Sequence, residues 1–348
     1  MPDTSPNSEQ PAFAVDSVLD APYAGIEQQA RDLAAMGFDG AFTLESNRDV
    51  LFPLALAARS GAGLHLYPNV AIAFPRSPMH LAYQAWDLQQ LTEGRFALGL
   101  GSQIRPHIEK RYSARWDRPV RQMRELVAAT KAIFRTFHEG EPLAFRGDYY
   151  TFTLMTPTFI PPPLEWGPPP IWMGALGPQM TRAAAEVADV VLIHPFNTER
   201  FLREQTLPRV EAGLAASGRA RADFGLTVTT IVCVYGTDEE RVAAERGCRF
   251  NLAFYGSTPS YRVTLDVHGW EGLQPELNRL TKEGRWAEMG ELIDDEVLRT
   301  ICVCGTPAEV AAQLRARFAG LADRVAFSVP YGVRPELLAE VLDLLRAN

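Results

Sequence analysis

The sequence lacks the features that define several classes of protein. Its 348 residues include only four cysteines, Cys233, Cys248, Cys302 and Cys304, too few in too long a chain for a secreted domain held by disulfides. One residue separates Cys302 from Cys304, and no second pair of possible metal ligands lies nearby. We therefore expect small residues on a buried strand and no metal site. No apolar run approaches the roughly 20 residues that cross a membrane. Residues 1–12 lack a signal-peptide pattern and are expected to form a frayed tail on a soluble, cytoplasmic protein.

A basic block or stripe is also missing. The net charge is −8, from 34 Lys and Arg against 42 Asp and Glu, and the cations are scattered along the chain. This distribution gives no support to nucleic-acid binding. There is no HExxH motif, Walker loop or Ser–His–Asp order, so zinc-protease, P-loop and serine-hydrolase chemistry find no support. A pair of catalytic carboxylates, as in glycosidase barrels, stays open, with Glu45 as one candidate.

The apolar residues, 47% of the chain, fall in short runs that alternate with amphipathic helical stretches. Such alternation favours parallel strands joined by crossover helices, and we expect a (β/α)8 TIM barrel. A doubly wound open sheet is the main competitor, but no Gly-rich dinucleotide fingerprint follows the first strand. The expected strands are 13–19, 40–44, 64–74, 96–100, 171–174, 190–193, 226–235, 301–304 and 325–329.

The regular pattern breaks twice within a single expected domain, residues 13–348. The first break, at 141–170, follows the fourth strand and its helix. It is rich in proline and aromatic residues and predicts an excursion with a short hairpin over one end of the barrel. The second break, at 254–296, follows the seventh strand and is mostly helical. Both insertions are expected to shape a substrate pocket, because such loops carry specificity.

Polar residues follow several of the expected strands. In TIM barrels the loops after the strands build the active site. Glu45 follows strand two, where it could orient a ring or substrate, or pair with Arg48. Gln103 and His107 follow strand four and could hydrogen-bond a planar heterocycle, with His107 as an acid or base near neutral pH. A capped turn with a solvated histidine is the structural alternative.

The loop after strand five predicts a phosphate site. Its glycines let the backbone approach a ligand, and its proline suits the first position of a helix. Free N–H groups there favour an anion, although an ordinary strand-to-helix turn would have the same residues. The loop comprises Gly174, Ala175, Leu176, Gly177, Pro178, Gln179 and Met180.

Side chains in the predicted loops suggest a pocket for a flat or apolar small molecule. For each aromatic residue among them, packing of the insertions onto the barrel is the alternative. The pocket candidates are Arg48, Tyr112, Trp116, His194 and Phe196.

Three segments together resemble the luciferase-like family of TIM-barrel oxidoreductases. They are Leu91–Ser102, Ala185–Val191 and Gly305–Val310, and the likeness spans about residues 13–330. Gln103–Arg111 is most similar to the branch that uses the deazaflavin coenzyme F420.

The resemblance implies a cofactor in the barrel mouth. Its ring would lie against a bulge of strand three that carries a non-proline cis peptide, which maps best to Asn69–Val70 with Ala71 following. The loop after strand five would hold its phosphate, with Gln103 and His107 near the ring. In one departure, relatives often place a histidine three residues after the strand-two acid, where this chain has Arg48 after Glu45.

The activity implied by the resemblance is F420-dependent hydride transfer to or from a small organic substrate. One alternative is a reduced-FMN monooxygenase, supplied by a separate flavin reductase, acting on an aromatic or polyketide-like substrate. A non-catalytic flavin-binding paralogue is another, because a barrel can keep its fold and lose its chemistry. The family also implies a homodimer.

Overall fold

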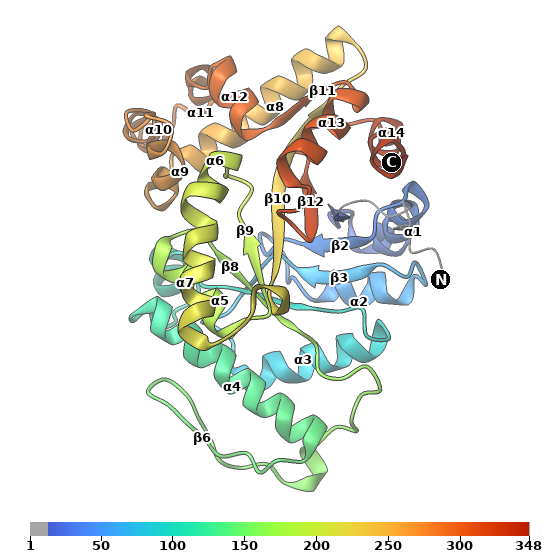
Figure 1. The fold of residues 1–348 in the computed structure, drawn as a ribbon, viewed down its shortest axis with the longest axis vertical. Helices are drawn as coiled ribbons and strands as arrows, with labels where there is room; N and C mark the ends of the chain where they lie inside the picture. Colours follow the sequence, from blue (N-terminus) through green and yellow to red (C-terminus); the bar gives the residue numbers. More distant parts are fainter. Residues whose placement is uncertain (1–12, 348) are drawn as a thin grey trace, which may run out of the picture.

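The computed structural model describes residues 13–347, in which parallel strands form a ring surrounded by helices (Figure 1). The strands follow the order β3-β2-β1-β12-β10-β9-β8-β5-β4. β3 (His65–Pro68) and β4 (Ala71–Ile72) are two halves of one segment, so both ends of this order meet. A parallel bridge between Leu66 and Phe96 joins β3 to the chain that enters β5. The ring therefore closes into the predicted TIM barrel.

Strands and outer helices alternate along the chain, as the sequence predicted. The other barrel strands are β1 (Ala14–Val18), β2 (Gly40–Thr43), β5 (Leu98–Gly101), β8 (Ile171–Ala175), β9 (Val190–Ile193), β10 (Gly225–Val234) and β12 (Arg324–Ser328). The helices around them are α1 (Ile26–Met36), α2 (Phe52–Arg59), α3 (Pro78–Leu91), α4 (Pro119–Glu139), α5 (Pro178–Val187), α7 (Leu207–Ser217), α13 (Pro307–Phe318) and α14 (Pro335–Arg346). The tail predicted for residues 1–12 lies outside the described residues.

The strand expected at 301–304 is not part of the barrel. β10 pairs directly with β12 through residues 227–231, which leaves no place between them. Ile301 instead ends α12 (Asp295–Ile301), and β11 (Val303–Gly305) pairs with the last three residues of β10. β10 has ten residues, and its end projects past the ring and carries β11. A local apolar pattern cannot distinguish such an extension from a barrel strand.

The second insertion is mostly helical, as expected, and gathers at one end of the molecule (Figure 1). It contains α8 (Asp238–Gly256), α9 (Arg262–Asp266), α10 (Leu273–Lys282), α11 (Trp286–Met289) and α12. α8 begins with a reciprocal capping box between Thr237 and Glu240. These helices enclose a core of their own with the end of β10 and with β11. Within residues 13–347, no helix combines the length and the apolarity that spanning a membrane requires.

The first insertion contains the predicted hairpin, formed by β6 (Phe145–Arg146) and β7 (Thr151–Phe152). Many of its contacts lie on α3 and α4. Tyr83 and Trp86 of α3 donate to carbonyl groups of the excursion at 2.6 and 3.1 Å. Glu125 of α4 accepts N–H groups from its hairpin turn. The hairpin and the following turn therefore pack against the outer helices, whereas Trp166 near the end of the excursion lies against Gly94, just before β5.

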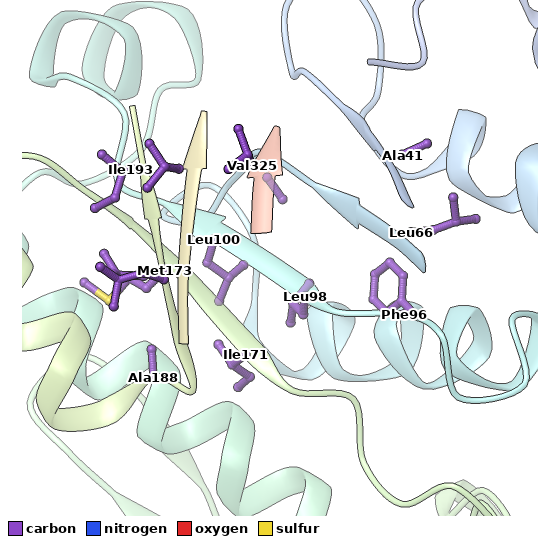
Figure 2. Packing of buried hydrophobic residues seen from close by; sticks show 14 of the residues in the cluster. Ala41, Leu66, Phe96, Leu98, Leu100, Ile171, Met173, Ala188, Ile193 and Val325 are labelled. Atoms are coloured by element: carbon purple, nitrogen blue, oxygen red, sulfur yellow. The ribbon is translucent and has the colours of Figure 1, made fainter. Parts of the chain in front are cut away.

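Two apolar layers follow from the alternation of side chains along each strand. Outward residues such as Leu98, Leu100 and Met173 pack against the surrounding helices (Figure 2). Inward residues fill the barrel itself, and they are Phe42, Tyr67, Ala97, Trp172, Leu192 and Ala326. A buried polar group completes this inner layer, because the Asp16 carboxylate accepts from the Tyr67 hydroxyl and from Arg324 Nε, each at 2.8 Å.

Candidate active site

The carboxyl ends of the strands remain open, whereas the layer below them is closed. Leu44, just past β2, is 49% exposed, but Phe42 two residues earlier is 1% exposed. Asn69 is half-buried and Tyr67 below it is fully buried, and His194 at the end of β9 also keeps exposed surface. Side chains therefore fill the lower barrel and leave its carboxyl-end rim accessible, where TIM barrels bind ligands.

The break between β3 and β4 forms the bulge that the resemblance implied, and the Asn69–Val70 peptide is cis. Glycines on neighbouring strands make room for it. A Cβ at Gly101 would collide with Val70, and one at Gly174 would lie 3.1 Å from the same side chain. A Cβ at Gly99 would collide with the backbone of Pro68, at the end of β3. Part of the glycine pattern read as a ligand approach thus serves the packing of the bulge.

Glu45 ties the far side of this bulge to the rim. Its Oε2 accepts the Ile72 N–H at 2.7 Å and Arg76 Nη1 at 2.8 Å, and its Oε1 accepts the Tyr112 hydroxyl at 3.2 Å. The Glu45 side chain is only 6% exposed. Arg76 also donates to the Ile72 carbonyl at 2.8 Å, and Ala71 is buried beside it. Three donors occupy the carboxylate, an arrangement that suits positioning of the bulge.

Side-chain amides connect the other side of the bulge to strands β10 and β9. Asn69 Nδ2 donates to Thr229 Oγ1 at 2.9 Å. Asn197 Nδ2 donates to the Thr229 carbonyl at 3.0 Å and to the His194 carbonyl at 2.6 Å. This chain of hydrogen bonds crosses the mouth from the bulge to His194.

His194 is held in one protonation and hydrogen-bonding state. Burial lowers its pKa to about 3, so the ring is neutral at physiological pH. Its Nδ1 accepts the Phe196 N–H at 3.1 Å, which places the ring hydrogen on Nε2. Ring centroids of Tyr255 and Tyr261 lie 4.7 and 4.4 Å away. Phe196 is 1% exposed within the core of the second insertion, so it supports His194 and does not line an open pocket as predicted.

In the loop after β5, the fourth barrel strand along the chain, Gln103 has a left-handed backbone conformation with φ 59°. Its Oε1 accepts the following Ile104 N–H at 3.0 Å. His107 is half-buried at the start of a short π-helical turn, His107–Arg111. Among residues 13–347, no partner hydrogen-bonds its ring. Gln103 thus shapes the turn and His107 keeps both ring nitrogens available.

The predicted pocket residues Tyr112 and Trp116 belong to the same loop. The Arg111 guanidinium lies 5.0 Å from the Tyr112 ring centroid. Burial, and then the Glu45 carboxylate, raise the pKa of Tyr112. Trp116 packs edge-on against Phe74, with 5.4 Å between centroids, and both packing and pocket roles fit its partly buried position.

Arg48 lies apart from Glu45, and the two do not form the pair that the sequence left open. Arg48 Nη1 donates to the Ala21 carbonyl at 2.7 Å and its guanidinium lies 5.5 Å from the Tyr23 ring centroid. Arg48 also lines a hollow of about 330 Å³ at the ends of β1 and β2, together with Leu44. That volume suits part of a small molecule.

The loop after β8 leads into α5 with an open first turn. Gly177 is the N-cap and no side chain caps the helix. A Cβ at Gly177 would have no atom within 4 Å. The first-turn N–H groups of a helix lack intrahelical partners, so those of Gln179 and Met180 are available to an anion. Gln179 and Pro178 are exposed, Leu176 and Met180 are half-buried, and Ala175 is buried in β8.

The structure adds residues that sequence reasoning missed. Arg76, Asn197, Thr229 and Tyr261 each contact a predicted site residue. Thr229 alternates with outward apolar residues along β10, and Asn197 closely follows His194, so both offered weak signals. The partner of Arg76 lies 31 positions earlier in the chain, which local patterns cannot reveal. Across the described residues, no group of three or more His, Cys, Asp or Glu side chains could hold a metal ion.

Comparison with known proteins agrees with this architecture. The family model for luciferase-like monooxygenases matches residues 4–324. An uncharacterized protein of Mycobacterium tuberculosis is 47% identical over 289 residues, 83% of this chain and 85% of that protein. The 5,10-methylenetetrahydromethanopterin reductase of Archaeoglobus fulgidus is 28% identical over 311 residues, 87% of this chain and 88% of the reductase.

A second relative from M. tuberculosis is named a putative coenzyme F420-dependent oxidoreductase. It is 28% identical over 298 residues, 80% of this chain and 83% of that protein. Among solved structures, the coenzyme F420-dependent tetrahydromethanopterin reductase of Methanopyrus kandleri superposes with a TM-score of 0.79. It is 19% identical and covers 96% of this chain and 97% of its own, a likeness that concerns the fold.

Proposed function

This chain belongs to the luciferase-like monooxygenase family, and we propose that it is an F420-dependent oxidoreductase acting on a small organic substrate. The observation that carries the proposal is the open first turn of α5 at Gly177, on the same rim as the bulge at Asn69 and Val70. The two features present an anion site and an apolar surface flanked by an amide. A flat redox ring with a phosphate-bearing tail requires both.

Each rim residue has a part in this proposal. F420, when bound, supplies the hydride chemistry, and the protein contributes position and electrostatics. The N–H groups at the start of α5 would bind its phosphate, and Val70 and Asn69 would support the ring. Glu45 and Arg76 keep the bulge in place. His107 is the candidate to move a proton at its free ring nitrogens.

His194 would contact the substrate. A neutral histidine whose Nδ1 already accepts a hydrogen bond can only donate through Nε2. Such a donor suits a carbonyl or alcohol oxygen, and it stays neutral because burial keeps its pKa near 3. Arg48 lines the hollow at the ends of β1 and β2. Tyr112 and Trp116 belong to the loop after β5, and we assign all three residues to the proposed pocket.

The choice of F420 over FMN rests on relatives. Two proteins at 28% identity over most of this chain are a methylenetetrahydromethanopterin reductase and a putative F420-dependent oxidoreductase. The sequence of residues 103–111 supports the same choice. A reduced-FMN monooxygenase working with a flavin reductase remains the alternative outcome of the test.

The test is titration of the purified protein with F420 and with FMN, following fluorescence quenching. We expect saturable F420 binding and no FMN binding at the same concentrations. Binding of FMN alone would replace this proposal with the monooxygenase. Failure to bind either cofactor would support the non-catalytic paralogue.

A further inference from the structure

All four cysteines of the chain meet in one buried cluster. Cys233 lies near the end of β10, Cys248 on α8, Cys302 directly after α12 and Cys304 on β11. Each is a free thiol, and the largest exposed fraction among them is 6%, at Cys304. The sequence predicted only small residues of a buried strand.

The four cysteines belong to the same buried core, formed by the second insertion, the end of β10 and β11. Ordinary packing of small apolar residues does not require every cysteine of the chain to gather at one place. The cluster is not arranged to hold a metal ion, so thiol chemistry is the property to consider.

Cys233 and Cys304 are the pair best placed for a covalent bond. They are direct register partners on the parallel strands β10 and β11. Register partners on neighbouring strands lie about 4.8 Å apart and project to the same face. A disulfide joins Cα atoms about 4.4–6.8 Å apart, so the backbones need little movement. Gln313 fixes β11 here, because its side chain donates to the Cys304 carbonyl at 2.7 Å and accepts the Cys304 N–H at 3.3 Å.

Cys304 is also the thiol most ready to react. The neighbouring Cys233 and Cys302 side chains, followed by the charges of Arg299 and Arg317, lower its pKa. The neighbouring Cys248 and Cys304 side chains, and then burial, raise the pKa of Cys233, which remains a thiol. The thiolate is the form of cysteine that a peroxide oxidises, and an adjacent second thiol can convert the product to a disulfide. Cys304 is also the one cysteine of the four with exposed surface.

We propose that Cys233 and Cys304 form a reversible disulfide when the protein meets a hydroperoxide. The Cys304 thiolate attacks the terminal peroxide oxygen, the O–O bond breaks, and a sulfenic acid and hydroxide or alkoxide result. The Cys233 sulfur then attacks the sulfenic sulfur and the S–O bond breaks. Two thiols lose two electrons and two protons overall, and the hydroperoxide is reduced to water and its alcohol, or to two waters for hydrogen peroxide.

The bond would attach the second insertion more firmly to the barrel. β11 ends that insertion, and β10 begins in the barrel and carries Thr229 of the rim network. α8, whose Cys248 lies in the cluster, also carries Tyr255 against His194. The site does not depend on which cofactor the barrel binds, so it can be tested without any cofactor.

The experiment exposes the full-length, reduced protein to hydrogen peroxide, unfolds it in an alkylating agent and measures its intact mass and tryptic peptides. We expect alkylation to fall from four thiols to two, and the mass of the protein without its alkyl adducts to be lower by two hydrogens. Peptides 222–241 and 300–315 should be cross-linked, with fragmentation assigning the bond to Cys304 and not Cys302. Dithiothreitol should restore all four thiols.

Two variants make the assignment specific. Cys304→Ser should keep its three thiols, whereas the matched variant Cys248→Ser, altered in the same cluster, should still lose two. The proposal would be overturned if the folded protein kept four alkylated thiols under a treatment that oxidises the unfolded chain. A disulfide between another pair of cysteines, or over-oxidation without a cross-link, would overturn it as well. If Cys304→Ser does not fold, the wild-type peptide map decides alone.

Discussion

Replacement of Glu45 by alanine should loosen the bulge between β3 and β4. Glu45 accepts hydrogen bonds from Ile72, Arg76 and Tyr112 while only 6% of its side chain is exposed. The variant leaves the Ile72 N–H without its acceptor. It also leaves the Arg76 guanidinium, whose side chain is 17% exposed, with Asp49 at 3.2 Å as its remaining carboxylate.

The contacts set the size of the effect. Breaking a buried ion pair by removing one partner costs about 3–5 kcal/mol, and an unsatisfied buried N–H about 1–3 kcal/mol. These costs overlap, and Asp49 retains part of the charge pairing. We therefore expect Glu45→Ala to lower the free energy of unfolding by about 3 kcal/mol. Glu45→Gln, which keeps an acceptor oxygen, should lose less.

The assay is equilibrium urea unfolding, paired with cofactor titration of the folded variants. Glu283→Ala is the matched control, because Glu283 also bridges arginines but its side chain is 40% exposed. Exposed pairs contribute about 1 kcal/mol or less. If Glu45→Ala unfolds like Glu283→Ala and binds cofactor like the wild type, the carboxylate does not hold the bulge and the reasoning fails.

Three further predictions concern the rim and the barrel interior. Gly177→Val should weaken cofactor binding several-fold without loss of stability, because the added side chain enters space open to the phosphate. Gly272→Val, at another N-cap glycine in open space, is the control and should leave the cofactor titration unchanged. Equal cofactor binding by both variants would exclude the phosphate site. His107→Ala should reduce turnover more than cofactor affinity, and unchanged turnover would remove it from the mechanism. Burial lowers the pKa of His65 and of His194 from 6.5 to about 3. Below pH 6.5 the unfolded chain therefore binds protons that the folded chain does not. As the pH falls from 6.5 to 4.5, the free energy of unfolding should decrease by about 1.4 kcal/mol per pH unit for each ring. Urea unfolding of His65→Gln should show a shallower slope, and an identical slope would contradict the assignment.

The barrel was predictable because its signals are local. A strand buried on both faces gives a short apolar run, and an outer helix gives a 3.6-residue period, whatever the rest of the chain does. The loop at Gly174–Met180 was recognisable for the same reason, since glycines and a helix-starting proline adjoin in sequence. The same local logic misplaced 301–304, because a strand that extends β10 beyond the ring has the same apolar pattern as one inside it.

For the candidate site, the sequence predicted where residues lie but not what they contact. The residues at the ends of strands, such as Glu45 and His194, could be named because chain order places them at the rim of any TIM barrel. Their roles could not, because the partners of Glu45 lie 27 to 67 positions away. Phe196 shows the same limit, since burial beneath the second insertion depends on helices that begin more than 40 residues later.

The sequence alone determined the family, the alternation of strands and helices, and the rim on which ligand-binding residues gather, because these depend on periodicity and short motifs. Only the tertiary structure decided which carboxylate is already occupied, which histidine is neutral, and that four distant cysteines lie in one buried cluster. Those properties arise from desolvation and from contacts between segments far apart in the chain, and both exist only after the barrel and its insertions have closed.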